Sequence, residues 1–308
     1  MRIVVVGLGT QGRKRMTVAE GDVVATVDPI AADARYQSID QVPLESFDAA
    51  LVCTPDQAKI ELMSYLISNG KHVLVEKPLL ASSTAQLASL TESIQTSGVA
   101  CYTAYNHRFE PNVLALNELL EAGTLGNVYL ARFFYGNGTA LDVKGSPWRD
   151  HGLGVISDLG SHLLDLTRML FGETGANFEL RSAHQFETRC YDHALMVSDG
   201  NPVVELEMTF LSWRNTFTVD VFGSLGSAHI DCLCKWGPSR FTVRQRVFPS
   251  GVPGETVKTI ESLDPTWAAE YEHFKHLCQS GGTNIENDQW INSVLEEISL
   301  AQRSEVVS

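Results

Sequence analysis

The chain has 308 residues, of which 44% are hydrophobic and 19% are charged, and its formal net charge is −14 at pH 7. This length allows two domains with separate cores, and the composition is that of an ordinary globular protein. A negative field of this size repels nucleic acid and anionic lipid, so the sequence predicts neither as a partner.

The apolar stretches are all shorter than a membrane span, which requires roughly 18 residues, so we expect no membrane partner. The opening segment Met1–Gly7 ends its short apolar run in a glycine turn, unlike the longer apolar region of a signal peptide. We therefore expect a cytoplasmic protein whose six cysteines are free thiols. Cys232, Cys234 and His229 are close in sequence, but no second ligand pair follows at zinc-site spacing, and no metal site is predicted.

A glycine motif follows the first predicted strand. Ile3–Val6 has the apolar texture of a buried strand, and a glycine-rich turn connects it to a segment compatible with a helix. In that setting the first glycine permits a tight turn, the second lets backbone N–H groups approach a pyrophosphate, and the third lets helix and strand pack closely. The alternative is a glycine turn in an unrelated α/β protein. The residues predicted to bind a dinucleotide are Gly7, Gly9, Thr10, Gln11 and Gly12.

An acidic residue ends the second predicted strand. Val23–Val27 leads directly to Asp28, which lies 16 residues after Gly12. A carboxylate at this point is placed to accept hydrogen bonds from both hydroxyls of an adenosine ribose. It would also repel a 2′-phosphate, so the sequence favours NAD over NADP as the cofactor.

The rest of the first half alternates strands with helices. The segment between the second and third strands, residues 29–47, is short for a full helix and loop, so we expect an abbreviated crossover there. Further strands are predicted at 49–53, 73–75 and 100–104, with helices at 57–69 and 83–96. This alternation is typical of a doubly wound parallel sheet. The predicted fold class is therefore α/β, with an N-terminal Rossmann domain over residues 1–122.

The strand at 73–75 is followed by Glu76-Lys77-Pro78. Proline cannot extend a central ladder, and Pro78 also keeps Lys77 out of the helical region. The ammonium of Lys77 is therefore expected at the carboxyl edge of the sheet, the same edge as the glycine motif, where open α/β sheets bind ligands. The alternative is a loop ion pair between Glu76 and Lys77, which would contribute little.

From residue 123 the texture changes, and we predict an α+β domain over 123–308 with a mostly antiparallel open sheet. Strands are predicted at 128–135, 194–198, 203–210, 216–222, 228–233, 241–248 and 255–260. An amphipathic helix at 111–122 precedes them, and late helices within about 265–302 are expected to pack back toward the N-terminal domain. A helix at 157–171 would carry Asp158, His162 and Asp165 on one face.

Five segments occur in a fixed order along nearly the whole chain. They are the glycine motif, Thr54-Pro55, Glu76-Lys77-Pro78, Asn106-His107-Arg108-Phe109 and Asp158-Leu159-Gly160-Ser161-His162-Leu163-Leu164-Asp165. In this the chain resembles the glucose-fructose oxidoreductase / inositol dehydrogenase (Gfo/Idh/MocA) family of NAD(P)-dependent oxidoreductases. The resemblance implies that Lys77 and His162 are the catalytic pair and that Asp158 binds a substrate hydroxyl. It also implies cofactor contacts from the motif residues Thr54, Pro55, Glu76, Lys77 and Asn106, and a homodimer or homotetramer formed through the second sheet.

The chain departs from the family pattern at two points. Lys59 stands where relatives often have a histidine after Thr-Pro, and Gly152-Leu153-Gly154 replaces a run of three glycines. Neither departure touches the three residues for which catalytic roles are implied.

The implied pair suits the oxidation of a secondary alcohol. The cofactor would carry the hydride, and a poised base must remove the hydroxyl proton. His162 suits that exchange because a histidine titrates near neutral pH. Lys77 could stabilise developing alkoxide charge, and Asp158 could fix a neighbouring hydroxyl.

The substrate predicted from these features is a sugar or a nucleotide sugar. The residues predicted to bind it are Lys77, Arg108, Trp148, Arg149, Asp158 and His162, with Lys144 as a further possibility. The basic residues among them would suit a phosphate-bearing sugar; alternatively they pair with Asp142, Asp150 and Glu110. Two other functions stay open: a reductase or dehydrogenase acting on an inositol or a keto-sugar, and a non-catalytic NAD-binding regulator.

Overall fold

The computed structural model describes residues 1–173 and 177–307, except for the side chains beyond Gln302. Contacts within these residues divide the chain into two compact units. The first unit contains Met1–Asn106 and Thr266–Asn292, and the second contains His107–Pro265 and the chain from Ser293 onward. This division falls at residue 106, whereas the sequence predicts a domain boundary at 122.

The first unit contains a five-stranded parallel sheet in the order β2-β1-β3-β4-β5. Its strands are β1 (Ile3–Val6), β2 (Val23–Val27), β3 (Ala49–Val52), β4 (His72–Glu76) and β5 (Cys101–Ala104). Its helices are α1 (Thr10–Val18), α2 (Asp56–Ser68), α3 (Thr84–Ser97) and α8 (Thr266–Ser280), followed by the start of α9 (Ile285–Val307). The predicted doubly wound parallel sheet is thus confirmed.

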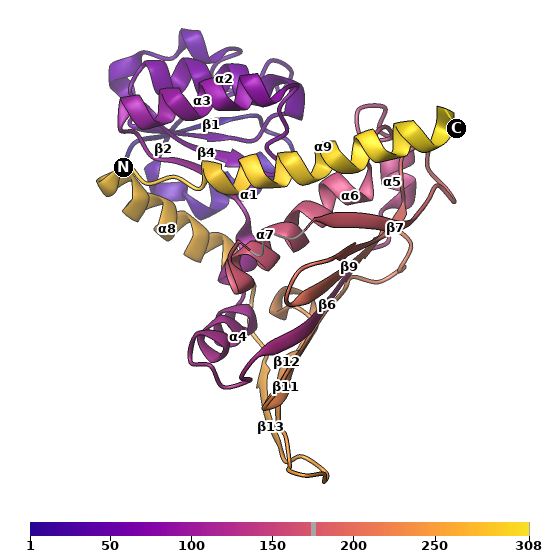
Figure 1. The fold of residues 1–308 in the computed structure, drawn as a ribbon. Helices are drawn as coiled ribbons and strands as arrows, with labels where there is room; N and C mark the ends of the chain where they lie inside the picture. Colours follow the sequence, from indigo (N-terminus) through magenta and orange to yellow (C-terminus); the bar gives the residue numbers. More distant parts are fainter. Residues whose placement is uncertain (174–176, 308) are drawn as a thin grey trace. The chain divides into compact units, whose positions relative to one another are not determined.

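Helices cover both faces of this sheet. The pair α2 and α3 packs on one face, and α1 and α8 pack together on the other (Figure 1). Because both faces are covered, β1 and β3 are buried along their whole length, which explains their continuous apolar sequences. The abbreviated crossover is also confirmed, since only the short 3₁₀ turns Ile39–Gln41 and Leu44–Ser46 connect β2 to β3.

The topology of the first unit identifies its ligand-binding edge. From β1 the chain moves outward to β2, whereas from β3 it moves in the opposite direction to β4. The two central strands β1 and β3 therefore flank a topological switch point, and the crevice outside their carboxyl ends is where sheets of this kind bind ligands. The glycine motif follows β1 at this edge, and Thr54-Pro55 follows β3.

The second unit contains an eight-stranded sheet in the order β13-β12-β11-β10-β6-β9-β8-β7. Its strands are β6 (Val128–Gly136), β7 (Phe178–His184), β8 (His193–Ser198), β9 (Val203–Thr209), β10 (Thr216–Gly223), β11 (Gly226–Asp231), β12 (Ser239–Gln245) and β13 (Glu255–Ile260). All neighbouring pairs are antiparallel except β6 and β9, which run parallel. The predicted, mostly antiparallel second sheet is confirmed.

Helices α4 (Pro111–Glu121), α6 (Val155–Asp158) and α7 (Gly160–Phe171) pack on this sheet, and α5 (Ala140–Lys144) precedes α6 (Figure 1). The single helix predicted at 157–171 is divided at Leu159 into α6 and α7. Side chains alternate along the central strand β6: Ala131 and Phe133 are buried, whereas Arg132 is exposed. The sheet therefore has one packed face and one face with partly exposed side chains.

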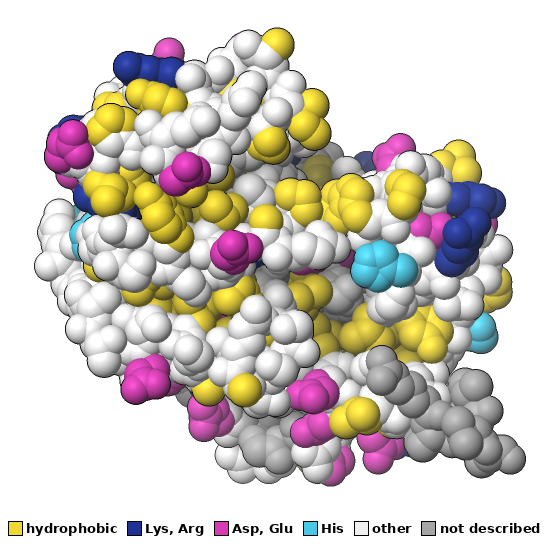
Figure 2. All heavy atoms as spheres, turned by 90° about the horizontal axis from the view of Figure 1, so that it is seen from above, with side chains coloured by type: hydrophobic (Ala, Val, Ile, Leu, Met, Phe, Trp, Pro, Cys, Tyr) yellow, Lys and Arg dark blue, Asp and Glu magenta, His cyan; other side chains and the backbone are white. Residues whose placement is uncertain are grey.

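The surface carries charges of both signs. On the face seen in Figure 2, acidic side chains are scattered over the surface and basic side chains form a few small groups. Among the described residues, none of the helices combines the length and the apolar character needed to cross a bilayer.

Candidate active site

The glycine turn after β1 is tightly packed at its first and third glycines and open at its second. Gly7 has φ +92°, and a Cβ added there would lie 2.6 Å from the carbonyl oxygen of Cys53. A Cβ at Gly12 would lie 1.8 Å from the carbonyl oxygen of Gly7, so α1 packs against the turn with no room for a side chain. By contrast, a Cβ at Gly9 would meet nothing within 4 Å. The first and third glycines therefore shape the turn, and the second leaves open space in front of the first turn of α1.

Asp28 supports this turn from the end of β2. Its carboxylate accepts the backbone N–H of Leu8 at 2.7 Å and those of Ile30 and Ala31 at 2.8 and 2.9 Å. Burial acts to raise the pKa of Asp28, but these three N–H groups outweigh it and lower the pKa. Asp28 is therefore ionised at neutral pH and is held beside the glycine turn.

The other predicted cofactor residues follow the ends of strands or begin helices. Thr10 and Gln11 are exposed in the first turn of α1. Thr54 follows β3, and its buried Oγ1 has no hydrogen-bond partner among the described residues. Pro55 is the N-cap of α2. Asn106 follows β5 and donates from Nδ2 to Thr266 Oγ1 at 2.7 Å, so part of its side chain anchors the start of α8.

Lys77 follows β4, and its surroundings are fixed on both sides. Glu76 accepts a hydrogen bond from Arg15 Nε at 2.7 Å. Lys59 Nζ donates to the carbonyl oxygen of Pro78, also at 2.7 Å. Asn292 donates to the carbonyl oxygen of Leu79 at 2.7 Å and accepts the N–H of Ala81 at 3.0 Å. The half-buried Lys77 thus belongs to a loop whose backbone is held at several points, and the carboxylate of Glu76 pairs with Arg15.

Sequence reasoning missed Arg15 and Asn292, and it named Lys59 only as a departure from the family pattern. Arg15 is almost fully buried, pairs with Glu76 and Glu270, and lies over the ring of Trp267 with its Cζ 4.3 Å from the centroid. Burial alone would lower the pKa of Arg15, but Glu270 and Glu76 offset this and raise it above the usual value. Arg15 sits three residues after Gly12, and a basic residue so close to a glycine motif could have suggested a partner. Nothing in the local sequence marks Asn292.

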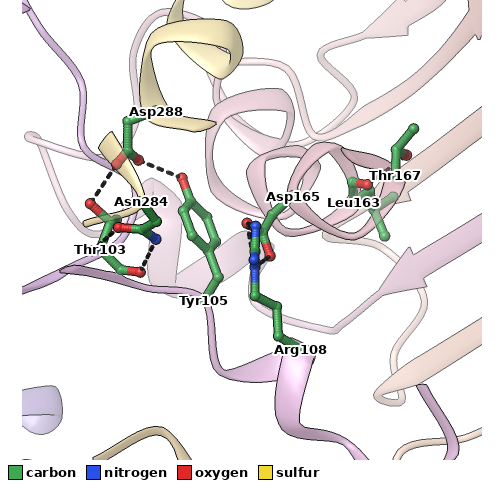
Figure 3. A network of polar contacts seen from close by, with 8 residues as sticks. All are labelled: Thr103, Tyr105, Arg108, Leu163, Asp165, Thr167, Asn284 and Asp288. Carbon is green, nitrogen blue, oxygen red and sulfur yellow. Dashed lines mark hydrogen bonds and ion pairs between the residues drawn. The ribbon is translucent and has the colours of Figure 1, made fainter. Parts of the chain in front are cut away.

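A second contact network fixes β5, the strand that leads to Asn106. Asp288 accepts from Thr103 Oγ1 at 2.7 Å and from the Tyr105 hydroxyl at 3.3 Å (Figure 3). Asn284 accepts the N–H of Thr103 at 2.8 Å and donates to its carbonyl oxygen at 2.9 Å. These contacts tie the end of β5 to the first turn of α9.

In the second unit, the acidic and histidine residues of the D-x-G-x-H-x-x-D segment lie on α6 and α7. The entry to α6 requires glycine, because Gly154 has φ +51° and a Cβ there would lie 2.3 Å from the carbonyl oxygen of Tyr191. The N–H of Val155 donates to that same carbonyl at 2.8 Å. The departure at Gly152-Leu153-Gly154 thus still has a glycine at its constrained position.

His162 is buried and its ring stacks on that of His107, with centroids 4.0 Å apart and an interplanar angle of 17°. Tyr135 on β6 lies against both rings, with centroid distances of 5.2 Å to His107 and 6.0 Å to His162. Burial, together with the charge of Asp158, raises the pKa of Tyr135, so its hydroxyl keeps its proton at neutral pH. The sequence named His107 only as part of a motif, and its contact with His162 could not be read from it.

The two aspartates of the same segment pair with arginines. Asp165 is fully buried and accepts two hydrogen bonds from Arg108 Nε, at 2.7 and 2.9 Å, and one from Nη2 at 2.7 Å (Figure 3). Asp158 accepts from Arg149 Nη2 at 3.1 Å. Two of the acidic residues that the sequence offered as alternative partners instead accept backbone N–H groups. Asp150 accepts those of Arg189 and Cys190, and Glu110 accepts that of Cys234.

The predicted site residues therefore form two groups, one in each unit. Those of the first unit are Gly7, Gly9, Thr10, Gln11, Gly12, Asp28, Thr54, Pro55, Glu76, Lys77 and Asn106. Those of the second are Arg108, Trp148, Arg149, Asp158 and His162, of which Trp148 is 51% exposed. Among the described residues there is no group of three or more His, Cys, Asp or Glu side chains arranged to hold a metal. Of the residues that the sequence analysis considered for a metal site, His229 contacts Asp220 and Cys234 contacts Glu110.

Two protein-family models match this chain. Residues 1–105 match an oxidoreductase family described as having an NAD-binding Rossmann fold, and residues 113–229 match the GFO/IDH/MocA C-terminal domain. Together these matches cover well over half of the chain.

Individual relatives share less than a third of their aligned residues with this chain in the comparisons described next. The rhizopine catabolism protein MocA of Rhizobium meliloti is 26% identical over 59% of this chain, and the match spans 61% of that protein. The scyllo-inositol 2-dehydrogenase (NAD(+)) of Bacillus subtilis is 27% identical over 94% of this chain and 89% of its own length. Among solved structures, a levoglucosan dehydrogenase in complex with NADH has a TM-score of 0.83 at 17% identity, covering 98% of this chain and 97% of that chain. That likeness demonstrates the shared fold.

Proposed function

We propose that this chain, which belongs to the GFO/IDH/MocA family of oxidoreductases, is an NAD-dependent dehydrogenase of a secondary hydroxyl group on a sugar or polyol. The observation that carries the proposal is the fixed position of Lys77. An ammonium that follows β4 at the ligand-binding edge of a doubly wound sheet, in a loop held through Glu76, Pro78, Leu79 and Ala81, is preorganised for catalysis.

The residues around the glycine turn fit a dinucleotide. The open space at Gly9 and the exposed first turn of α1 would receive the pyrophosphate, and Asp28 would accept hydrogen bonds from the ribose hydroxyls. Thr54 follows β3 and Asn106 follows β5, two strands of the same parallel sheet, so both are further candidate contacts at this edge. Because the ionised Asp28 would repel a 2′-phosphate, we propose NAD and not NADP as the cofactor.

The bound nicotinamide would accept the hydride, and the residues of the chain would handle the proton and the developing charge. As the carbon–hydrogen bond breaks, His162 takes the hydroxyl proton and the alcohol becomes a ketone. Lys77 donates a hydrogen bond to the same oxygen and stabilises its negative charge. Asp158 accepts a hydrogen bond from a neighbouring hydroxyl and so fixes which carbon reacts.

The charges near His162 favour an uncharged substrate. Arg108 is bound by the buried Asp165 through both Nε and Nη2, and Arg149 contacts Asp158. Each arginine therefore already faces a carboxylate, which reduces what it can offer to a phosphate. We propose a neutral sugar or polyol in preference to a nucleotide sugar, in keeping with relatives named for inositols and levoglucosan.

We further propose that the partly exposed face of the eight-stranded sheet forms the contact in a homodimer or homotetramer. This face carries partly buried apolar side chains: Leu130 on β6 lies opposite Phe222 on β10, and Phe134 lies farther along β6. The substitution Leu130→Asp would place a charge in such a contact. Sedimentation that gives the same mass for this variant and the unaltered chain would argue against this interface.

The proposal is tested by a screen of sugars, inositols and nucleotide sugars with NAD or NADP, followed at the nicotinamide absorbance. We expect NADH formation with at least one neutral sugar or polyol, and much slower reduction of NADP. Assays with NADH and keto-sugars establish the preferred direction. If calorimetry shows NAD binding while no compound in either direction is turned over, the chain is a non-catalytic NAD-binding protein and the proposal is wrong.

A further inference from the structure

We propose that Lys235, acting through His107, is a positioning residue that holds the imidazole of His162 and favours its neutral, proton-accepting form. The inference rests on the proposed function, in which His162 removes the proton of the substrate hydroxyl. Neither Lys235 nor a role for His107 follows from the motifs in the sequence.

Lys235 is linked to His162 by a direct series of contacts. Lys235 Nζ lies 3.0 Å from His107 Nε2, and the ring of His107 stacks on that of His162 at 4.0 Å. An ammonium can only donate, so Nε2 of His107 accepts this hydrogen bond and the neutral ring carries its proton on Nδ1. His107 is 1% exposed and His162 5% exposed, so water screens this contact little.

Aromatic rings enclose the pair of histidines and restrict their rotation. Tyr135 lies against both, and Phe217 meets His107 edge-on with a centroid distance of 5.8 Å. The ammonium of Lys235 lies 4.7 Å from the ring centroid of Trp236, a geometry in which the ring attracts the cation. The stack is therefore held from several sides.

The turn that carries Lys235 is anchored to the segment that carries His107. The fully buried Glu110 accepts the N–H of Cys234 at 3.1 Å, and its second oxygen lies 3.1 Å from Cys234 Sγ. The N–H of Glu110 in turn donates to the carbonyl oxygen of His107 at 3.1 Å. The two segments thus meet at two points, His107–Lys235 and Glu110–Cys234, and this fixes the ammonium relative to the stack.

The electrostatic consequence concerns the proton on His162. Two stacked imidazoles cannot both be protonated without strong repulsion, and the ammonium beside His107 disfavours a proton on that ring. The same positive charge also disfavours the imidazolium form of His162. His162 is therefore kept ready to accept a proton near neutral pH.

Other charges also surround α7. The charged or titratable groups on the described elements that pack near α7 include Arg108, Glu110, Tyr135, Arg149, Asp158 and Asp165. Asp165 and Asp158 each contact an arginine, so these pairs add little net charge. Both oxygens of the Glu110 carboxylate contact Cys234, whereas the ammonium of Lys235 directly contacts the stack.

The first test is the pH dependence of kcat/KM for oxidation of the substrate found in the screen. Lys235→Met removes the charge, Lys235→Arg keeps it, and Lys258→Met removes an exposed lysine of β13 as the matched control. Without the ammonium the neutral form of His162 is less favoured, so activity falls at low pH and is retained at high pH. We expect the ratio of kcat/KM at pH 8 to that at pH 6 to rise roughly threefold in Lys235→Met. Lys235→Arg and Lys258→Met should keep the unaltered profile.

A loss of activity that is equal at all pH values in Lys235→Met would overturn the inference, because it would indicate only a structural role. The inference is equally wrong if Lys235→Arg shifts the profile as much as Lys235→Met does, because the charge would then not be the cause.

The second test needs no turnover. Histidines labelled with ¹⁵N are titrated by NMR, and the signals of His162 are identified by their loss in His162→Asn. We expect the titration of His162 to move to higher pH in Lys235→Met and to stay unchanged in Lys258→Met. If the titration moves although no alcohol is oxidised, the proposed function fails while this inference stands. If alcohols are oxidised and the titration does not move, the inference is wrong.

Discussion

At the scale of single residues, two ion pairs with a buried partner lie next in sequence to residues of the candidate site. Arg15 pairs with Glu76 beside Lys77, and Asp165 pairs with Arg108 beside His107. Removing one partner of a buried pair typically costs about 3–5 kcal/mol, because the remaining charge is left uncompensated. Residues of these pairs can therefore be needed for the stability of the fold and not for catalysis. A substitution that tests catalysis must leave the pairs intact.

The substitutions Lys77→Ala and His162→Ala test catalysis and leave both ion pairs in place, because neither side chain is one of the paired carboxylates or guanidiniums described above. Each variant is expected to lower kcat by about 10²-fold or more, since each removes a group that handles the proton or its charge. Binding of NAD, measured by calorimetry, should persist in both. Lys275→Ala and His184→Ala serve as controls on exposed or partly exposed positions. An unchanged kcat in both active-site variants would remove the roles assigned to them.

The cysteines allow a prediction that does not depend on activity. All six are free thiols, and burial raises the pKa of Cys234 to about 11 and of Cys278 to about 12. Burial also raises the pKa values of Cys53 and Cys101. Because the thiolate is the reactive form, we expect negligible alkylation by iodoacetamide at pH 7.5 in the folded protein and rapid alkylation in denaturant. Mass spectrometry counts the modified residues. Fast labelling of Cys53 or Cys101 in the folded protein would show that their surroundings are open.

At the scale of elements, the sequence predicted the parts that depend on local pattern. The glycine turn, the alternation of strands and helices, and the strand at 255–260 all follow from periodicity and turn residues. It missed β7, where the polar sequence Glu179-Leu180-Arg181-Ser182 contains a register shift, and the short helix α5. It also could not predict Lys59, His107 or Lys235 as parts of the site, because their partners are distant in sequence and only the tertiary fold brings them together.

The glycine turn offers a matched pair of substitutions. In Gly12→Ala the new Cβ would lie 1.8 Å from the carbonyl oxygen of Gly7, so strand and helix must separate. In Gly9→Ala the Cβ would meet no protein atom within 4 Å, and the backbone φ of −68° accepts alanine. We expect Gly12→Ala to lower Tm by several degrees and Gly9→Ala to leave Tm unchanged.

The same pair should differ in NAD binding. The Cβ of Gly9→Ala enters the space assigned to the pyrophosphate, so the Kd for NAD should rise about tenfold or more although the protein is as stable as the unaltered chain. Calorimetry measures the Kd, and circular dichroism measures Tm. Unchanged NAD affinity in Gly9→Ala would show that the dinucleotide does not approach the backbone at this glycine.

At the scale of the whole molecule, an excess of acidic groups links stability to pH. The formal charge of −14 gives general repulsion at neutral pH, but several carboxylates are stabilised in their ionised form. A hydrogen bond from Tyr271 and contacts with the N-terminal ammonium lower the pKa of Asp22. Hydrogen bonds from Arg2 lower the pKa of Asp48 to about 2. Such groups favour the folded state only while they are ionised.

The sign of the effect follows from linkage. A carboxyl group whose pKa is lower in the folded state contributes stability above its unfolded pKa of roughly 4, and that contribution is lost as the pH falls toward the folded pKa. We therefore expect Tm to change little between pH 7 and 5 and to fall steeply from about pH 4 toward pH 2. The variant Asp22→Asn/Asp48→Asn should be less stable at pH 7 but should lose less Tm on acidification, because two of the groups that would have to be protonated are gone. Both carboxylates are partly exposed, Asp22 at 26% and Asp48 at 40%, and the two single variants measure the share of each. Parallel Tm curves for the double variant and the unaltered chain would mean that other carboxylates govern acid unfolding.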